Sequence, residues 1–273
     1  MIGRFQGLGA RILWQATALA VLVLASCSPQ PLSVTREPTT LRLAAAASCE
    51  TLIREAAARY EADHPWVAVT TEVLNNRLAE ETLHDERADI GLLSWRPAAE
   101  NERDGLWSEP FVRDGVAVVV HPDSPVQEIG LSQLREIYRG HLQEIDGVVL
   151  TVVSREPGSG TRAAFEHFVL DGEETSLNAV VLPSADAMVD YVAETPTAIG
   201  YVSTWSLDDR VRALPVDGML SDAESVANGR YPISREFHLA SAGEPTGEAR
   251  QFAQWLLRGG AEMSGAHGGD PEG

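Results

Sequence analysis

Lysine is absent from this 273-residue chain, so every basic side chain apart from histidine is an arginine. Lysine and arginine together number only 21, against 40 aspartates and glutamates, and the formal net charge at pH 7 is −19. A chain so poor in positive charge lacks the basic surface on which nucleic-acid-binding proteins depend. Nucleic acid is therefore excluded as a partner. The choice of arginine over lysine indicates no function.

Cysteine is scarce, with one residue at Cys27 and one at Cys49. Residues 1–26 begin with a basic region and continue as an apolar segment too short for a stable spanning helix. The segment ends in Leu-Ala-Ser-Cys, which resembles the lipobox of bacterial lipoproteins. It predicts a signal peptide over residues 1–26, lipidation of Cys27 and an exported, membrane-tethered protein. The alternative is an ordinary signal peptide followed by a chance cysteine. Acylation of Cys27 would leave Cys49 without an intramolecular disulfide partner.

Several motifs that would indicate catalysis or metal binding are also missing. The chain has no P-loop, which would need a lysine, and no G-x-S-x-G nucleophile elbow. The histidines show no H-E-x-x-H spacing, so no metal and no cofactor are expected. Neither a nucleophile–base pair nor a carboxylate dyad is visible, which makes an enzyme the least favoured class. After residue 26, no run is long and apolar enough to span a membrane.

The most informative stretch that is present joins a strand to a helix. Residues 147–153 are apolar and rich in β-branched side chains, which predicts a buried strand, and helical spacing of apolar residues comes after them. The turn between them contains Arg155, Ser159 and Thr161. A helix N-terminus presents unpaired N–H groups and partial positive charge, so this turn could hold an oxyanion without a metal. The alternative is a loop whose hydroxyl only caps the helix.

Strands alternate with helices along the remaining chain, which indicates a largely parallel α/β architecture. A flexible tether is expected over residues 27–40, and a disordered tail over residues 261–273. Further strands are expected at 41–46, 67–73, 88–94, 116–121, 180–182 and 198–202. Further helices are expected at 48–64, 131–138, 185–192 and 251–257.

Five ordered segments resemble the phosphate-binding proteins of ABC transporters. They are SREPGSGTRAAFE from Ser154, DGVAVVVHPDSP from Asp114, LSQLREIYRG from Leu131, AIGYVS from Ala198 and NGRYPISR from Asn228. The resemblance implies a two-lobed type II periplasmic-binding-protein fold, with the ligand in the cleft between the lobes. It places one lobe at 41–115, the other at 116–221, and a return to the first at 222–260.

The resemblance also implies which residues bind the anion in the central loop. The family's phosphate loop matches at Arg155, Ser159, Gly160 and Thr161. Pro157 replaces an aspartate that the family carries two residues after the arginine.

Two other family loops are diverged in this chain. Only Ser48 remains of the usual Gly-Ser-Thr-Ser after the first strand, and it could instead be a helix cap. Asn76 occupies the serine position of the next loop, although Asn75 and Asn76 could be turn formers only, and Arg77 beside them could supply a second guanidinium or be a solvated charge. Ser94 lies where members have aspartate or serine. Because phosphate near neutral pH carries a proton and sulfate does not, a missing carboxylate acceptor predicts looser selectivity. Glu156 or Asp89 could restore that acceptor, and Ser94→Asp would be expected to sharpen the preference for phosphate.

The resemblance favours a monomeric lipoprotein that captures inorganic phosphate and delivers it to the permease subunits of an ABC importer. One alternative is the same fold binding sulfate, molybdate, tungstate or an organic phosphate, which the lost glycines and aspartate support. The other is a sensor or adhesive lipoprotein with a degenerate pocket.

Overall fold

The computed structural model describes residues 36–96, 105–145 and 147–265, with side chains described up to residue 259. The chain divides into two units, Met1–Glu37 and Pro38–Gly273, and the described helices and strands all belong to the second unit. The signal peptide expected at 1–26, Cys27 and the tether up to residue 35 lie outside the described residues.

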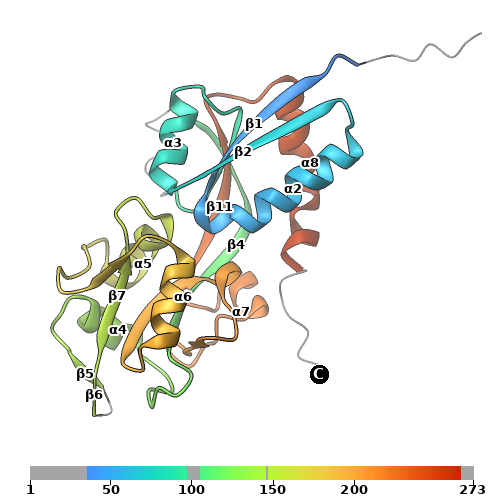
Figure 1. Ribbon diagram of the computed structural model, residues 1–273. Helices are drawn as coiled ribbons and strands as arrows, with labels where there is room; N and C mark the ends of the chain where they lie inside the picture. The colour runs from blue at the N-terminus through green and yellow to red at the C-terminus, as the bar shows by residue number, and fades with distance from the viewer. Residues whose placement is uncertain (1–35, 97–104, 146, 266–273) are drawn as a thin grey trace, which may run out of the picture. The chain divides into compact units, whose positions relative to one another are not determined.

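A nine-stranded sheet is the framework of the second unit (Figure 1). Its strand order is β2-β1-β3-β11-β4-β9-β7-β8, and β10 pairs with β4. The strands are β1 Thr39–Ala46, β2 Val67–Leu74, β3 Ile90–Leu93, β4 Trp107–Val120, β7 Thr151–Arg155, β8 Val180–Leu182, β9 Ala198–Ser203, β10 Arg212–Ala213 and β11 Ser234–Ser241. A separate hairpin joins β5 Glu144–Ile145 to β6 Val148–Val149.

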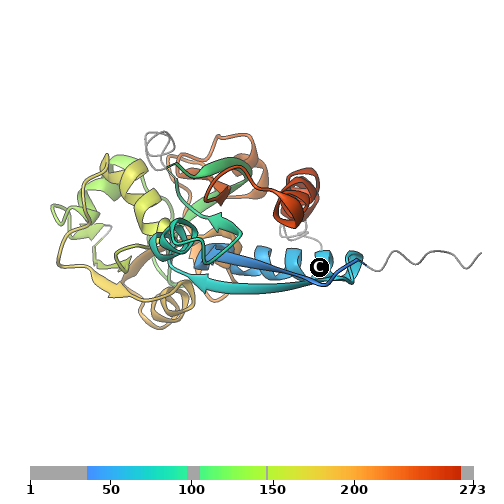
Figure 2. The same ribbon diagram turned by 90° about the horizontal axis from the view of Figure 1, so that it is seen from above.

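Helices cover both faces of the sheet. They are η1 Ala47–Cys49, α2 Glu50–Asp63, α3 Asn76–His84, α4 Leu131–Tyr138, α5 Gly160–Leu170, α6 Ala185–Glu194, η2 Thr204–Ser206, α7 Ala223–Ala227 and α8 Gly247–Gly265. Figure 2 shows α2 running beside β1 and β2. Among the described helices, none combines the length and the apolar character needed to cross a membrane.

The long strand β4 divides the sheet into two lobes. Its first part pairs antiparallel with β11, from Trp107 opposite Ser241 to Gly115 opposite Ser234. Its second part pairs antiparallel with β9, and parallel β7 and β8 extend that half. The first lobe therefore holds β1–β3 with α2, α3 and α8, and the second holds β7–β9 with α4, α5 and α6. The expected two-lobed α/β fold is confirmed.

Each lobe has its own hydrophobic core. The first packs Leu43 and Ile53 against Phe252 of α8, and the second packs Phe165 against Tyr201. Val226 of α7 belongs to the second core. The lobe boundaries expected from the sequence stay a prediction, and this packing favours a return to the first lobe along β11 rather than at residue 222.

Several elements differ from the sequence-based expectation. β4 begins at Trp107 rather than Val116, because Pro110 and the charges around it hide the alternating pattern. The strand expected at 147–153 divides into β6 and β7. The helix α3 was not expected, although Ala79, Thr82 and Leu83 recur on its buried face.

The ends of the described chain differ as well. Thr39 and Thr40, expected in the tether, begin β1, where Thr39 lies opposite Val67. Residues 261–265, expected in the disordered tail, continue α8. The two glycines at 259 and 260 each weaken a helix by only about 1 kcal/mol. The helix can continue through them, because extending a helix that has already formed avoids the cost of nucleation. The rest of the expected tail lies outside the described residues.

Candidate functional site

The seven residues expected to bind an anion line one small cavity between the lobes. Its volume is about 190 Å³, including the part that opens to solvent. The residues that line it are Ala46, Ala47, Ser48, Asn75, Asn76, Ser94, Arg155, Glu156, Ser159, Gly160 and Thr161. The structure thus brings together positions that are as much as 113 residues apart, from Ser48 to Thr161. Their role as ligands stays a prediction.

The start of α5 forms the second-lobe side of this cavity. Ser159 is the N-cap, and its Oγ accepts a hydrogen bond from the N–H of Arg162 at 3.3 Å. A hydroxyl that accepts in this way keeps its own hydrogen available for a ligand. Gly160 and Thr161 are the first helical residues, where backbone N–H groups lack intrahelical partners. This terminus therefore presents several donors to the cavity.

Arg155 ends β7 at the edge of the cavity and is only 3% exposed. Its Nε donates to Glu156 Oε2 at 2.9 Å, and its Nη2 donates to Glu156 Oε1 at 3.1 Å. The adjacent carboxylate holds the guanidinium in one orientation while leaving other N–H donors of the fork unused by this pair. Arg155 can therefore supply a charge-assisted hydrogen bond to an anion.

Tyr201 fixes the backbone beneath Arg155. Its hydroxyl accepts from the N–H of Arg155 at 3.3 Å and forms a hydrogen bond with Ser154 Oγ at 2.8 Å. Burial raises the pKa of Tyr201 to about 12, although the hydrogen bonds from Ser154 and Arg155 oppose this effect. The phenol is therefore neutral at physiological pH. This contact gives the AIGYVS segment a structural role next to the candidate site.

The first-lobe side of the cavity is held together by Asn76. Its Oδ1 accepts from the N–H groups of Ser94 at 2.8 Å and Trp95 at 3.1 Å, and its Nδ2 donates to the Trp95 carbonyl at 2.9 Å. Ser94 Oγ also donates to Asn76 Oδ1 at 3.3 Å. Asn76 lines the cavity, but these contacts brace the turn that carries Ser94.

Gly160 brings the two sides into direct contact. A Cβ at this position would lie 2.2 Å from Ser94 Oγ and 3.0 Å from Asn76 Cβ. These distances are shorter than van der Waals contact, so a side chain here would force the loops apart. The N–H of Arg77 also donates to the Gly158 carbonyl at 3.3 Å. Glycine is therefore required for the observed approach of the lobes.

Three helix N-termini point their first residues at this cavity. Ser48 lies in the short helix η1, which leads directly into α2, Asn75 caps α3 through the N–H of Leu78, and Ser159 caps α5. The positive ends of helix dipoles attract anions, and unpaired N–H groups bind them directly. Together with Arg155, this arrangement suits an oxyanion. In the parts of the chain that are described, no group of three histidine, cysteine or acidic side chains could hold a metal ion.

The structure decides which charged candidates face the cavity. Asp89 forms a salt bridge with Arg42 at 2.6 Å and does not line the cavity. Glu156 does line it, and no other aspartate or glutamate is among the lining residues. Arg77 pairs with Glu81 at the exposed surface, so its guanidinium is directed to solvent.

Sequence reasoning missed a buried ion pair behind Thr161. Arg235 Nη2 lies 2.7 Å from Asp114 Oδ2, and it also donates to Thr161 Oγ1 at 3.1 Å. Both residues lie within segments that carry the family resemblance. Nothing in their local pattern showed that residues 114 and 235 would meet behind the candidate site.

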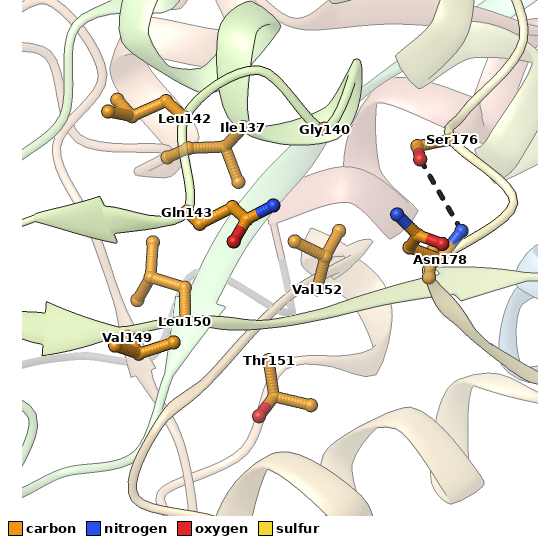
Figure 3. A pocket seen from close by; sticks show the side chains of 11 residues that line it. Ile137, Gly140, Leu142, Gln143, Val149, Leu150, Thr151, Val152, Ser176 and Asn178 are labelled. Carbon is orange, nitrogen blue, oxygen red and sulfur yellow. Dashed lines mark hydrogen bonds between the residues drawn. The ribbon is translucent and has the colours of Figure 1, made fainter.

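A larger cavity of about 780 Å³, again including the part that opens to solvent, lies elsewhere in the second lobe, between the end of α4 and the beginning of β7 (Figure 3). Ile137, Leu142 and Val152 form apolar walls, and Gln143 places its amide among them. No charged side chain and none of the expected site residues line it. Size alone therefore does not identify the anion site, since a dianion needs compensating charge or many donors.

Known proteins resemble this chain in both sequence and fold. A family model described as a PBP superfamily domain matches residues 33–259. The phosphate-binding protein PstS of Bacillus subtilis is 36% identical over 166 residues, which cover 57% of this chain and 55% of that protein. The chain thus matches about half the length of this curated relative.

Solved structures agree over a larger part of the chain. A putative phosphate ABC transporter substrate-binding protein from Clostridium perfringens, with bound phosphate, is 26% identical with a TM-score of 0.78. The match covers 84% of this chain and 98% of that one. An ABC-type phosphate transport receptor from Vibrio cholerae is 23% identical, with a TM-score of 0.71, and its match also covers 84% of this chain and 98% of that one. This second structure supports the fold. Given the family match and the two-lobed fold, the chain belongs to the PBP, or periplasmic-binding-protein, superfamily.

Proposed function

We propose that this protein captures inorganic phosphate for an ABC importer. The observation that carries the proposal is the meeting of Arg155, the N-terminus of α5 and two further helix N-termini at one small cavity. The Clostridium perfringens relative is described with bound phosphate, and the Bacillus subtilis relative is named a phosphate-binding protein. Both descriptions support the same ligand here.

Binding would replace the anion's hydration shell by protein donors. The hydroxyls of Ser159 and Thr161, the first N–H groups of α5 and the Arg155 guanidinium supply hydrogen bonds from the second lobe. Approach of the first lobe, through Ser48, Asn76 and Ser94, then excludes water. The net charge of −19 does not prevent this, because charges beyond about 8–10 Å are largely screened at physiological salt.

The membrane context forms part of the proposal. Lipidation of Cys27 would tether the protein outside the cytoplasm, and permease subunits would receive phosphate when the lobes open. We propose a monomeric binding protein without catalytic activity. Cys27→Ala is expected to release the chain from the membrane fraction or to block its processing. Recovery of that variant in membranes with the wild-type mass after lipid labelling would contradict the anchor.

A second candidate ligand is an oxyanion without a proton, such as sulfate, molybdate or tungstate. Pro157 and Ser94 stand where relatives can carry an acid, and this favours looser selectivity. Glu156 argues for phosphate, because its carboxylate lines the cavity and retains lone pairs beyond those used by Arg155. A free lone pair could accept the phosphate proton and would repel sulfate.

Calorimetric titration of the purified mature protein separates these candidates. Phosphate, sulfate, molybdate, tungstate and an organic phosphate are titrated at one pH and one salt concentration. Phosphate binding that exceeds all others supports the proposal. Tighter binding of another oxyanion supports the second candidate, and no heat with any of them favours the sensor or adhesive protein.

A further inference from the structure

A completely buried ion pair lies where the two crossing strands meet. Asp114 of β4 and Arg235 of β11 are opposite each other in the antiparallel register, and both side chains are 0% exposed. Arg235 Nε donates to Asp114 Oδ2 at 2.8 Å, and its guanidinium carbon lies 5.0 Å from the centre of the Phe237 ring. The guanidinium is therefore held on two sides.

The other oxygen of Asp114 binds the second lobe. Its Oδ1 accepts from Ser203 Oγ at 2.9 Å, and from Thr204 Oγ1 at 2.8 Å and Thr204 N at 3.1 Å. These bonds join β4 to the end of β9, so the carboxylate has little freedom to move. Because Arg235 is bonded to this fixed carboxylate, its guanidinium is also restricted in position.

The remaining side of Arg235 faces the candidate anion site. Its Nη2 donates to Thr161 Oγ1 at 3.1 Å, and its Nη1 is buried without a hydrogen-bond partner among the described residues. A guanidinium has no acceptor, so the hydroxyl hydrogen of Thr161 cannot be directed to Arg235. No acceptor for that hydrogen is found within the described residues, and Thr161 lines the cavity.

We propose that Arg235 is a positioning residue that makes Thr161 a dedicated hydrogen-bond donor to the oxyanion. This inference rests on the proposed function. By occupying a lone pair of Oγ1, Arg235 restricts the directions in which the hydroxyl hydrogen can point. It also links β11, a crossing strand, to the first turn of α5. The anion gains a preset donor, and Arg235 itself does not line the cavity.

A purely structural role for Arg235 makes a different prediction. If the ion pair only held the lobes in place, its loss would weaken anion binding whether or not residue 161 has a hydroxyl. If Arg235 acts through Thr161, its loss should matter only when that hydroxyl is present. A double-mutant cycle measures this difference, because two residues that act through one contact are not additive.

The test measures phosphate affinity by calorimetry for the full mature protein and for Arg235→Gln, Thr161→Val and the double variant. When residue 161 is threonine, Arg235→Gln should weaken phosphate binding about tenfold, as expected for the loss of one charge-assisted hydrogen bond. When residue 161 is valine, the same substitution should weaken binding less than about twofold. Thr161→Ser, which keeps the hydroxyl, should retain the tenfold sensitivity. Equal losses in the threonine and valine backgrounds would overturn the inference.

Two further variants keep the test decisive. Arg113→Gln is the matched control, because Arg113 lies beside Asp114 on β4 and pairs with Glu236 at the exposed surface. Phosphate affinity should not change in this variant. If Arg235→Gln alone does not fold, Arg235→Gln is combined with Asp114→Asn, so that both buried charges are removed together. The cycle is then measured between this combined variant and Thr161→Val. A wild type that binds none of the oxyanions refutes the proposed function, whereas binding with additive effects refutes only this inference.

Discussion

The two lobes contribute unequal halves to the candidate site. The second-lobe loop presents a guanidinium at Arg155 and hydroxyls at Ser159 and Thr161 whose hydrogens have no acceptor among the described residues. In the first lobe, the Asn76 amide is bonded to Ser94 and Trp95, and Ser94 Oγ donates to Asn76 Oδ1. The comparison indicates that the second lobe supplies the charge and most donors, whereas the first shapes and closes the cavity. Variants in each lobe test this division.

The largest expected effect comes from removing the second-lobe charge. Arg155→Ala should weaken phosphate binding at least about tenfold, because a hydrogen bond to a charged group is worth roughly 1.5–3 kcal/mol. Arg77→Ala is the matched first-lobe control, since Arg77 is exposed and pairs with Glu81. Calorimetry with phosphate measures both. Equal losses in the two variants would mean that the charge is shared between the lobes.

The next largest effect on phosphate affinity should come from a substitution that keeps the lobes apart. Gly160→Ala places a Cβ against Ser94 Oγ, so closure should be hindered and phosphate affinity reduced several-fold, while the second lobe keeps its donors. Ser94→Ala removes that oxygen and should restore part of the affinity. Gly243→Ala is the control, because no atom lies within 4 Å of a Cβ there. Wild-type affinity in Gly160→Ala would show that the close approach does not matter for binding.

Asn76 should matter more for stability than for contact with the ligand. Asn76→Ala leaves the N–H groups of Ser94 and Trp95 without their acceptor, which costs about 1–3 kcal/mol for a buried donor. The thermal midpoint without ligand should fall, with a smaller loss of phosphate affinity. Asn178→Ala, at an exposed position, should change neither. A large affinity loss at unchanged stability would make Asn76 a direct ligand.

Selectivity should depend on Glu156 rather than on residue 94. Glu156→Gln removes the negative charge from the cavity, so sulfate should compete with phosphate a few-fold better. The sequence alone favoured Ser94→Asp as a way to sharpen selectivity. The contacts of Ser94 argue against that choice, because a carboxylate at 94 would face Asn76 Oδ1 and crowd Gly160, and the variant's effect stays a prediction. Competition titrations at fixed pH compare the variants, and unchanged sulfate competition in Glu156→Gln would exclude Glu156 as the acceptor.

The smallest effect is a pH dependence of first-lobe stability. Burial lowers the pKa of His238, and the charge of Arg96 adds to this while Glu236 opposes it. The unfolded chain therefore takes up a proton more readily than the folded chain. The stability that the neutral His238 side chain contributes is fully present above about pH 6.5 and is lost as the pH falls toward the lowered pKa of His238. The thermal midpoint should fall between about pH 7.5 and about pH 5.5, and His238→Gln should flatten this slope.

The sequence determined the parts of the site that depend on local chain order. Residues 155–161 come after a β-branched strand and precede a helical pattern, so the arginine, the hydroxyls and the helix N-terminus are fixed within a few residues. The resemblance then predicted that Ser48, Asn76 and Ser94 would join them, and the structure places all of these positions at one cavity.

Only the tertiary structure decided what each of these side chains contacts. Asn76 braces Ser94, Glu156 rather than Asp89 faces the cavity, and Arg235 meets Thr161 from 74 residues away. Local patterns carry hydrophobic periodicity and turn preferences, which fix elements but not the direction of a polar side chain. That direction depends on which strands become neighbours, and β4 and β11 become neighbours through the pairing of distant segments.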